Sequence, residues 1–337
     1  MNNWKSILKN KSANWLLEKN NPSVRYFTLI DIFDKSKHKN EVIESKKQIM
    51  KSRVIQKILE KQNPEGYWFE PENFYIKRKY KGTVWNLIIL AEIGADEDEK
   101  RIKKTCEFIL KNSQNKDSGG FAYQSLKSGG GADSKILPCL TGNMIWCMIY
   151  FGFIDDPRVK KGIKWITTYQ RFDDGEQDLP KNFPYKKHIN CFGKHSCHMG
   201  VVKTLKALAE IPEEKRSNDV KKTLEIGVEY LLKHNIYKRS HDLSKVSKPS
   251  WLQLSFPHMY QSDILEVLDI LTRLGYKDKR MQDAIDILIS KQNQDGTWNL
   301  ERTFNGRFIT NIEMKGKPSK WITLNALRVL KRFYKDN

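Results

Sequence analysis

The sequence predicts an all-α fold built from a repeated helical hairpin, and three observations support this prediction. A phrase of the form Gln-x-x-x-Gly-x-aromatic recurs along the chain, an apolar run with helical spacing follows each copy, and strand-like alternation is scarce. The clearest copies are Lys61–Trp68 and Lys291–Trp298. We therefore expect about ten to twelve helices, paired as hairpins, in a single domain over residues 1–337.

The spacing of the phrases sets the size of the repeat. The glutamines Gln62, Gln114 and Gln170 stand about 52 to 56 residues apart, and the gap from Gln170 to Gln292 is about two periods. A period of this length accommodates two helices with their loops, and the repeats run from about residue 21 to residue 334. Residues 30–53 are highly charged, so we expect a solvated helix and a connection there.

Each phrase comes after one apolar helix and before a second. The expected second helices, with one earlier candidate ahead of the first phrase, are residues 24–33, 83–93, 140–151, 199–211, 264–274 and 321–333. Leu265, Leu268 and Leu271 show the helical spacing that defines these runs. Gly94 and Gly152 stand where a left-handed residue would end two of them.

The phrase itself has a mechanical interpretation. In the last copy, Gly296 supplies the turn, the Gln292 amide can bond the main chain of a neighbouring helix, and Trp298 can bury a large apolar area. A repeat cannot bury its apolar face alone, so these residues are expected first of all to fasten one repeat to the next.

A Q-x-x-x-G-x-W phrase at helix ends, repeated every 50 to 60 residues, resembles the QW-type repeats of the terpenoid cyclase and protein prenyltransferase superfamily. The resemblance implies an α/α toroid of five to six helical hairpins, in which inner helices line a central cavity. It also suggests an apolar or isoprenoid-like small molecule as the partner, with an anionic group in some cases. Such repeats specify a fold better than a function.

Composition bounds the remaining possibilities. The net charge is +20, but the basic residues are scattered and no nucleic-acid-binding motif is present, so no nucleic-acid partner is expected. The longest apolar run, Met144–Ile154, is too short to span a bilayer. The first residues lack the apolar segment of a signal peptide, and five cysteines indicate free thiols or metal ligands. We expect a cytoplasmic protein.

Potential metal ligands are most concentrated in a Cys/His cluster just before the expected helix 199–211. It contains Cys191, His195, Cys197 and His198, and Cys139 occupies the matching place one repeat earlier. Thiolates and imidazoles are the ligands that zinc prefers, so the predicted cofactor is Zn²⁺, held by the three cysteines with His195 or His198. The alternative is that these cysteines are small buried apolar residues.

Polar and aromatic residues gather at the starts of the second helices. If these starts share one rim of the cavity, they form a substrate site, although helix starts also gather polar residues because they lie near the surface. The predicted substrate-binding residues are Arg25, Lys81, Trp85, Asn143, Tyr260, Lys320 and Trp321. The predicted catalytic residues are His258, Asp263 and His241.

The leading functional hypothesis is a zinc-dependent transferase or cyclase, whose metal activates a nucleophile in the central cavity. By resemblance, prenyltransferases hold zinc with Asp, Cys and His, and lanthionine-forming cyclases use a Cys-His dipeptide like Cys197-His198. Two alternatives stay open: a non-catalytic scaffold with a structural zinc, and a metal-free terpene cyclase-like protein. The acidic D-x-D-D motif of proton-initiated cyclases is absent from the sequence.

Overall fold

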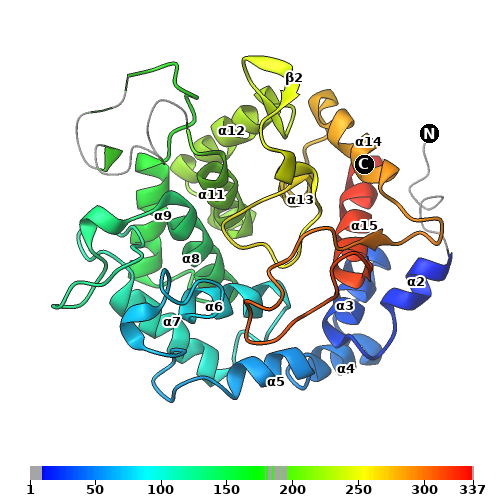
Figure 1. The fold of residues 1–337 in the computed structure, drawn as a ribbon, viewed down its shortest axis with the longest axis horizontal. Helices are drawn as coiled ribbons and strands as arrows, with labels where there is room; N and C mark the ends of the chain where they lie inside the picture. Colours follow the sequence, from blue (N-terminus) through cyan, green and yellow to red (C-terminus); the bar gives the residue numbers. More distant parts are fainter. Residues whose placement is uncertain (1–9, 179, 181–183, 186–190, 192–195, 336–337) are drawn as a thin grey trace.

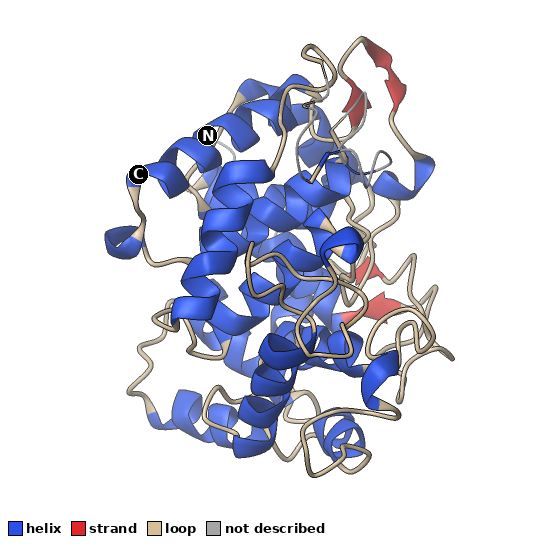
Figure 2. Cartoon of the chain, turned by 90° about the vertical axis from the view of Figure 1, so that its left-hand side faces the viewer, coloured by secondary structure: helices blue, strands red, loops and turns tan. Residues whose placement is uncertain are grey.

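A computed structural model of the chain describes residues 10–178, 180, 184–185, 191 and 196–335. Helices surround a common centre in a ring, with one set inside and a second set outside (Figure 1). In the side view the helices account for most of the chain, and the short strands lie along the right-hand side (Figure 2). The predicted all-α fold, an α/α toroid of helical hairpins, is confirmed.

The inner helices follow the second helix of each predicted hairpin. They are α3 (Pro22–Phe27), continued by the π-helical turn η1 (Thr28–Ile32), and α6 (Thr83–Glu92), α8 (Pro138–Tyr150), α11 (His198–Glu210), α13 (Ile264–Arg273) and α15 (Lys320–Tyr334). Residues of α6 from Thr83 to Ala91 are buried on every side, as are those of α8 from Pro138 to Ile149. These helices are apolar all round because both of their faces are covered.

The outer helices are amphipathic, since only one face meets the inner ring. In α7, for example, Ile102, Cys106 and Ile109 are buried while the lysines face outward. The outer helices are α4 (Asn40–Ile49), α5 (Arg53–Leu59), α7 (Lys100–Asn112), α9 (Pro157–Tyr169), α12 (Asn218–Lys233) and α14 (Gln282–Ser290), and α2 (Asn10–Leu16) lies beside α15. The charged segment 30–53 contains α4 and its connection to the ring.

Short elements complete the loops. They are the 3-10 turns η2 (Pro71–Asn73), η3 (Asp133–Lys135), η5 (Glu213–Lys215), η6 (Pro249–Leu252) and η7 (Lys279–Met281), and the strands β1 (Lys238–Arg239), β2 (Asp242–Val246), β3 (Trp298–Asn299) and β4 (Pro318–Ser319). The strands form two antiparallel pairs, β1 with β2 and β3 with β4.

The tryptophan of the repeated phrase binds the helix that precedes it in the same repeat. The Trp68 indole donates to the carbonyl of Ile58 at 2.7 Å, and the Trp298 indole donates to the carbonyl of Leu288 at 2.7 Å. Both tryptophans are fully buried. The first and last repeats therefore share the same contact, in which the tryptophan indole binds the carbonyl ten residues before it.

The glutamine and the glycine of the first phrase contact the next outer helix. The Gln62 amide donates to the Arg101 carbonyl at 2.9 Å and to the Thr105 hydroxyl at 2.7 Å. Gly66 has a φ of +95°, and a Cβ there would lie 2.6 Å from the Lys104 carbonyl. A side chain at this position would be strained and would also push α7 away from the loop.

The ring closes where α15 meets α3 and η1. The Arg328 guanidinium binds the Asp31 carboxylate, with Nε 2.8 Å from Oδ2. The Lys331 ammonium donates to the carbonyls of Asp31 at 2.9 Å and Ile32 at 3.1 Å. The C-terminal helix thus satisfies main-chain acceptors at the end of the first inner helix.

Candidate functional site

The centre of the ring is crossed by the loop between η6 and α13, residues 253–263 (Figure 1). The Phe256–Pro257 peptide bond in this loop is cis. The Phe256 ring stacks on Trp321 of α15, with centroids 4.5 Å apart. The Asn143 amide of α8 donates to the Met259 carbonyl at 3.1 Å. Inner helices from opposite parts of the chain therefore hold this loop in place.

The loop presents His258 beside Asp263, the N-cap residue of α13. His258 Nε2 lies 3.1 Å from Asp263 Oδ2, and both side chains are buried. Asp263 also accepts hydrogen bonds from the amide of Glu266 at 3.0 Å and from the amide and hydroxyl of Ser255 at 2.7 and 2.6 Å. With four donors around it, the Asp263 carboxylate is fixed, and it orients the imidazole in turn.

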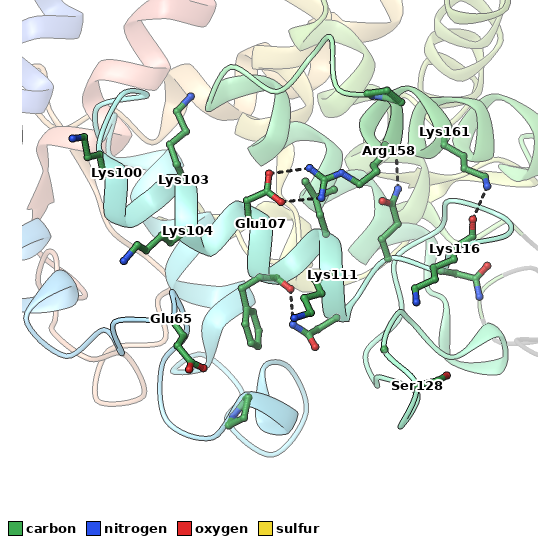
Figure 3. Close-up of a pocket in the computed structure, with 18 residues that line it drawn as sticks. Glu65, Lys100, Lys103, Lys104, Glu107, Lys111, Lys116, Ser128, Arg158 and Lys161 are labelled. Atoms are coloured by element: carbon green, nitrogen blue, oxygen red, sulfur yellow. Dashed lines mark hydrogen bonds and ion pairs between the residues drawn. The ribbon is translucent and has the colours of Figure 1, made fainter.

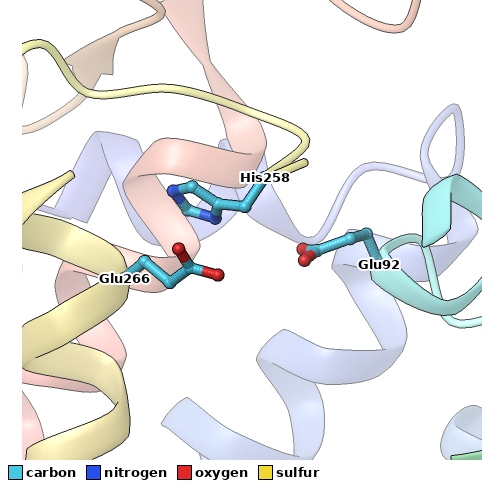
Figure 4. A group of neighbouring side chains, drawn as sticks. All are labelled: Glu92, His258 and Glu266. Atoms are coloured by element: carbon cyan, nitrogen blue, oxygen red, sulfur yellow. The ribbon is translucent and has the colours of Figure 1, made fainter. Parts of the chain in front are cut away.

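Two glutamates face His258 from other helices. One ring nitrogen of His258 and one carboxylate oxygen each from Glu92 and Glu266 lie within 4.8 Å of one another. Figure 4 shows the imidazole between the two carboxylates, which come from α6 and α13. Each of the three side chains reaches the same point at the centre of the ring.

Two lysines of α11 complete this central cluster, which we define as Glu92, Lys203, Lys206, His258, Asp263 and Glu266. Lys203 is fully buried, and its ammonium lies 2.6 Å from both carboxylate oxygens of Glu266. The Lys206 ammonium binds Glu92, lies 3.3 Å from Glu266, and sits 3.8 Å from the centroid of the Trp146 ring. Buried charges at such distances are stable only when they are paired in this way.

The cluster is balanced when His258 is protonated, with three cationic and three anionic groups. Burial lowers the pKa of His258, but the carboxylates of Glu266 and Asp263 outweigh that effect and raise it above its usual value. Burial likewise opposes ionisation of Glu266, yet Lys203 and His258 hold the pKa of Glu266 well below its usual range. The electrostatics therefore favour the charged form of both groups.

A cavity of about 270 Å³ adjoins the cluster, along the C-terminal halves of the inner helices. Its lining combines ion pairs with aromatic rings. These are the pairs Arg273–Glu210, Arg328–Asp31 and Arg332–Asp269, and the rings of Phe27, Trp146, Tyr150, Phe256 and Trp321. Glu92, Lys206, His258 and Glu266 line the same cavity. It offers a small ligand both hydrogen-bonding groups and apolar ring faces.

The central cluster is a poor metal site as it stands. Glu92, His258 and Glu266 have suitable ligand types and lie close together, but Lys203 and Lys206 already bind the two glutamates. A divalent ion would meet two ammonium groups at bonding distance from its own ligands. The arrangement fits a proton-transfer or hydrogen-bonding site better than a cation site.

The predicted substrate residues divide into two groups. Trp85, Asn143, Tyr260 and Trp321 all lie around the central loop: the Trp85 and Tyr260 rings are 6.2 Å apart, and Trp321 stacks on Phe256. Asn143 Oδ1 is buried and forms no hydrogen bond to the described residues. Trp321 also lines the central cavity, together with the predicted catalytic His258.

The predicted cations lie elsewhere. Arg25 donates to the Leu17 carbonyl and to the Ser45 hydroxyl on α4, and it lines a pocket outside the ring. Lys320 donates to Glu18 and Asn20, each at 2.7 Å, beside α2. Lys81 is partly buried in the loop before α6. The structure does not bring these three cations together around one anionic group.

The cysteines of the predicted zinc site are neighbours, although they do not converge. Cys139 is buried near the start of α8, Cys197 is the residue before α11, and Cys191 is partly buried. Burial, with the proximity of Cys197, raises the pKa of Cys191 to about 12. Among the described residues these thiols form no group of three ligands within 4.8 Å. His195 lies outside the described residues.

His198 lines another pocket, of about 360 Å³. Its ring lies 4.7 Å from that of His234, 4.5 Å from Trp251 and 5.4 Å from Tyr230, measured between centroids. His241, in the β1–β2 hairpin, lines this pocket and is not among the residues that line the central cavity. The predicted catalytic set is thus divided between two sites.

A further cavity, which we call the outer groove, lies outside the ring against α7 and α9 and has a volume of about 1280 Å³ (Figure 3). Its cations are Lys100, Lys103, Lys104, Lys111, Lys116, Lys161 and Arg158. Arg158 binds Glu107 and Asp156. In the described part of the chain, none of the six lysines pairs with a carboxylate, and three of them instead donate to main-chain carbonyls.

Sequence reasoning missed Glu92, Lys203, Lys206 and Glu266. The two lysines had a signal, because they stand three residues apart inside a mostly apolar run, 199–211, where a charged side chain needs a buried partner. No such signal marks Glu92 and Glu266 in the sequence, since their pairing depends on how α6 and α13 are placed around α11.

No helix in the described ranges is long and apolar enough to cross a bilayer.

The comparisons with known proteins concern both sequence and fold. The family model of the squalene-hopene cyclase C-terminal domain matches residues 36–190, less than half of the chain. No curated protein sequence gives a significant match. Among solved structures, an unsaturated glucuronyl hydrolase specific for heparin is 10% identical with a TM-score of 0.47, over 93% of this chain and 85% of that one.

Two further structures show comparable likeness. A sugar epimerase from a ruminal bacterium is 16% identical with a TM-score of 0.45, over 78% of this chain and 75% of that one. A type II terpene cyclase from Scytonema is 12% identical with a TM-score of 0.33, over 85% of this chain and 97% of that one. With TM-scores below 0.5, these likenesses assign no function. The match over residues 36–190 confirms the resemblance indicated by the repeated phrase, and the chain is similar to the terpenoid cyclase superfamily through a segment like the squalene-hopene cyclase C-terminal domain.

Proposed function

We propose that the protein is an enzyme that binds a small molecule in the central cavity and moves a proton with His258. The observation that carries this proposal is a buried imidazole, oriented by Asp263, that faces two carboxylates on the wall of a cavity. Structural ion-pair networks seldom need an imidazole that adjoins a cavity, whereas acid–base catalysis does.

The roles follow from the contacts. His258 is the proton donor, because its raised pKa keeps the imidazole charged near neutral pH. Asp263 is a positioning residue that holds Nε2, so the other ring nitrogen is left for the ligand. Glu92 approaches from the opposite helix, where Lys206 binds its carboxylate, and serves as the proton acceptor.

The lining favours a ligand with hydroxyl or carboxylate groups and one apolar face. Paired arginines and carboxylates both donate and accept hydrogen bonds, while Trp146 and Trp321 offer flat apolar surfaces. The volume of about 270 Å³ lies just below the usual range for drug-sized ligands, so the ligand is small. An isoprenoid-like molecule with an anionic group is the alternative, supported by the same aromatic rings.

Calorimetric titration tests this proposal. The panel contains monosaccharides, sugar acids and short prenyl diphosphates, and the proteins are the wild type, His258→Asn and Glu92→Gln. We expect one class to bind the wild type and to bind both variants at least about tenfold more weakly. Glu225→Gln, an exposed carboxylate on α12, is the matched control and should bind as the wild type does. If the ligand binds both site variants as tightly as it binds the wild type, the central cluster has no role in binding.

A zinc-dependent reaction is the second candidate, and the proximity of Cys139, Cys191 and Cys197 supports it. Thiols this close to one another are held neutral by burial and by mutual repulsion, and a bound zinc ion would favour their thiolate forms instead. Zinc would supply a Lewis acid or an activated nucleophile when bound. Elemental analysis of the wild type and of Cys197→Ala tests this candidate, which predicts about one zinc ion per chain that the variant loses.

A further inference from the structure

The outer groove concentrates positive charge on one side of the ring. Seven cations and two carboxylates line it, which gives a local net charge of +5, a quarter of the +20 of the whole chain. One of the two carboxylates, Glu107, is already bound by Arg158, whose two terminal nitrogens each lie 2.8 Å from a carboxylate oxygen. The central cavity, in contrast, is lined by as many basic side chains as acidic ones when His258 is counted as a cation.

Main-chain carbonyls hold several of these ammonium groups in place. The Lys103 ammonium donates to the Phe151 carbonyl at 2.7 Å. The Lys104 ammonium donates to the Pro64 carbonyl at 3.0 Å. A carbonyl orients an ammonium group but carries no net charge, so the positive charge stays available to a partner. Charges that are positioned before binding lose less side-chain entropy when the partner arrives.

The exposed lysines of α7 form a row along the groove. Lys100, Lys104 and Lys111 are four and seven residues apart, or about one and two turns, so they lie on one face of the helix. The row spans about 16 Å at the rise of an α-helix. Lys116 and Lys161 continue the positive charge past the end of the helix (Figure 3). An extended peptide of about five residues has the length of this row.

Apolar side chains lie between the charges. The partly buried Phe108 and the exposed Pro71 and Pro157 line the groove together with the lysines. The ion pair between Arg158 and Glu107 joins α9 to α7 and fixes the two walls against each other. The groove therefore offers a rigid surface that combines a few apolar contacts with an excess of cations.

We propose that the outer groove binds an acidic segment of a partner protein. Its carboxylates would pair with the lysines of α7, and an apolar side chain among them would contact Phe108. A second copy of this chain is disfavoured as the occupant, because each copy carries a net charge of +20. A bilayer surface is flat, so it cannot contact the floor of a groove of about 1280 Å³.

The groove is less suited to a nucleic acid. Bases are recognised by free amide groups and by exposed aromatic rings. Among the described residues that line the groove, Phe108 is the only aromatic ring, and it packs 5.2 Å from the Tyr67 ring between centroids. The Gln114 amide already donates to two main-chain carbonyls at 3.0 and 2.7 Å, and the Asn115 amide donates to a third at 3.0 Å.

Fluorescence anisotropy of the full chain tests the proposal. The probes are a labelled peptide of repeated Glu-Glu-Leu-Glu sequence, the same peptide with Gln in place of Glu, and labelled oligothymidylate. The groove variant is Lys100→Glu/Lys111→Glu/Lys116→Glu, whose lysine side chains form no hydrogen bond or ion pair with the described residues. The control variant, Lys46→Glu/Lys47→Glu/Lys315→Glu, changes the net charge equally at exposed lysines that do not line the groove.

We expect the acidic peptide to bind the wild type, to bind more weakly as salt is added, and to bind the groove variant at least about tenfold more weakly. The glutamine peptide should not bind, and the control variant should bind the acidic peptide within about threefold of the wild type, because salt screens charges on other faces. Circular dichroism shows that each variant is folded.

Three results would overturn the proposal. The first is that the acidic peptide does not bind the wild type. The second is equal weakening in the groove and control variants, which would mean that net charge alone attracts the peptide. The third is that oligothymidylate binds the wild type more tightly than the peptide does and is lost in the groove variant, which would identify a nucleic-acid site. None of these outcomes depends on whether the central cavity binds a small molecule.

Discussion

The central cluster and the outer groove differ in how their lysines are paired. In the cluster, Lys203 is fully buried and lies 2.6 Å from Glu266, and Lys206 binds Glu92. In the groove, Lys103 and Lys104 donate to main-chain carbonyls, which leaves their charges uncompensated. A buried charge must be matched by another charge, whereas solvent can compensate an exposed one.

This difference shows where the net charge of +20 resides. The centre of the ring is close to neutral when His258 is protonated, so the groove and similar surfaces carry the excess of cations. Substitutions in the two regions should therefore have different effects on the free energy of unfolding, large at the centre and small at the groove.

The largest effect is expected for Lys203→Met. The substitution removes the closest partner of the buried Glu266 and leaves only the more distant Lys206 and His258 beside it, and breaking a buried pair typically costs about 3–5 kcal/mol in the free energy of unfolding. Urea denaturation followed by circular dichroism measures this loss. The double variant Lys203→Met/Glu266→Leu should recover much of it, because no unpaired charge remains and Lys206 keeps Glu92. A loss below about 1 kcal/mol in the single variant would contradict the pairing.

A smaller effect is expected when pH changes the stability that His258 contributes. The pKa of His258 is raised in the folded protein, so its contribution to stability is complete below the unfolded value of about 6.5 and is lost as pH rises through the folded value. The difference in unfolding free energy between wild type and His258→Asn should therefore shrink as the pH increases above about 6.5. A difference that widens with pH would show that the neutral imidazole is the favoured form.

The smallest effect is expected at the groove. Lys111→Glu/Lys116→Glu changes two lysines that form no ion pair in the described structure, so the free energy of unfolding should change by less than about 0.5 kcal/mol for each site. Retention on a cation-exchange column should fall clearly, since the net charge drops by four. A large loss of stability would mean that these lysines are structural, as Lys203 is.

The fold could be predicted from the sequence because the signals that determine it are local. Trp298 is buried and the Gln62 amide bonds the main chain of a neighbouring helix, as the phrase predicts, and helix 264–273 begins and ends within a residue of the expected bounds. Apolar spacing and turn glycines act over a few residues, so they can be interpreted without knowing the neighbours.

The site was accessible only in part. His258 and Asp263 are five residues apart and meet as neighbours at a helix start, but Lys206 and Glu92 are brought together from separate helices. The predicted rim also assumed that every helix start faces inward. Lys320 instead turns to Glu18, because the rotation of α15 about its axis depends on packing against α2.

The closure of the ring ties the two ends of the sequence together. Arg328 and Asp31 are separated by 297 residues, yet they form one ion pair. Contacts of such long sequence separation are costly to form early in folding, since the intervening chain must first be ordered. The inner helices can pair with their neighbours one after another, but α3 gains its second neighbour only when α15 arrives. Closing the ring therefore requires α15 to dock on α3, and until that contact forms the first and last inner helices each expose an unmatched face to other chains.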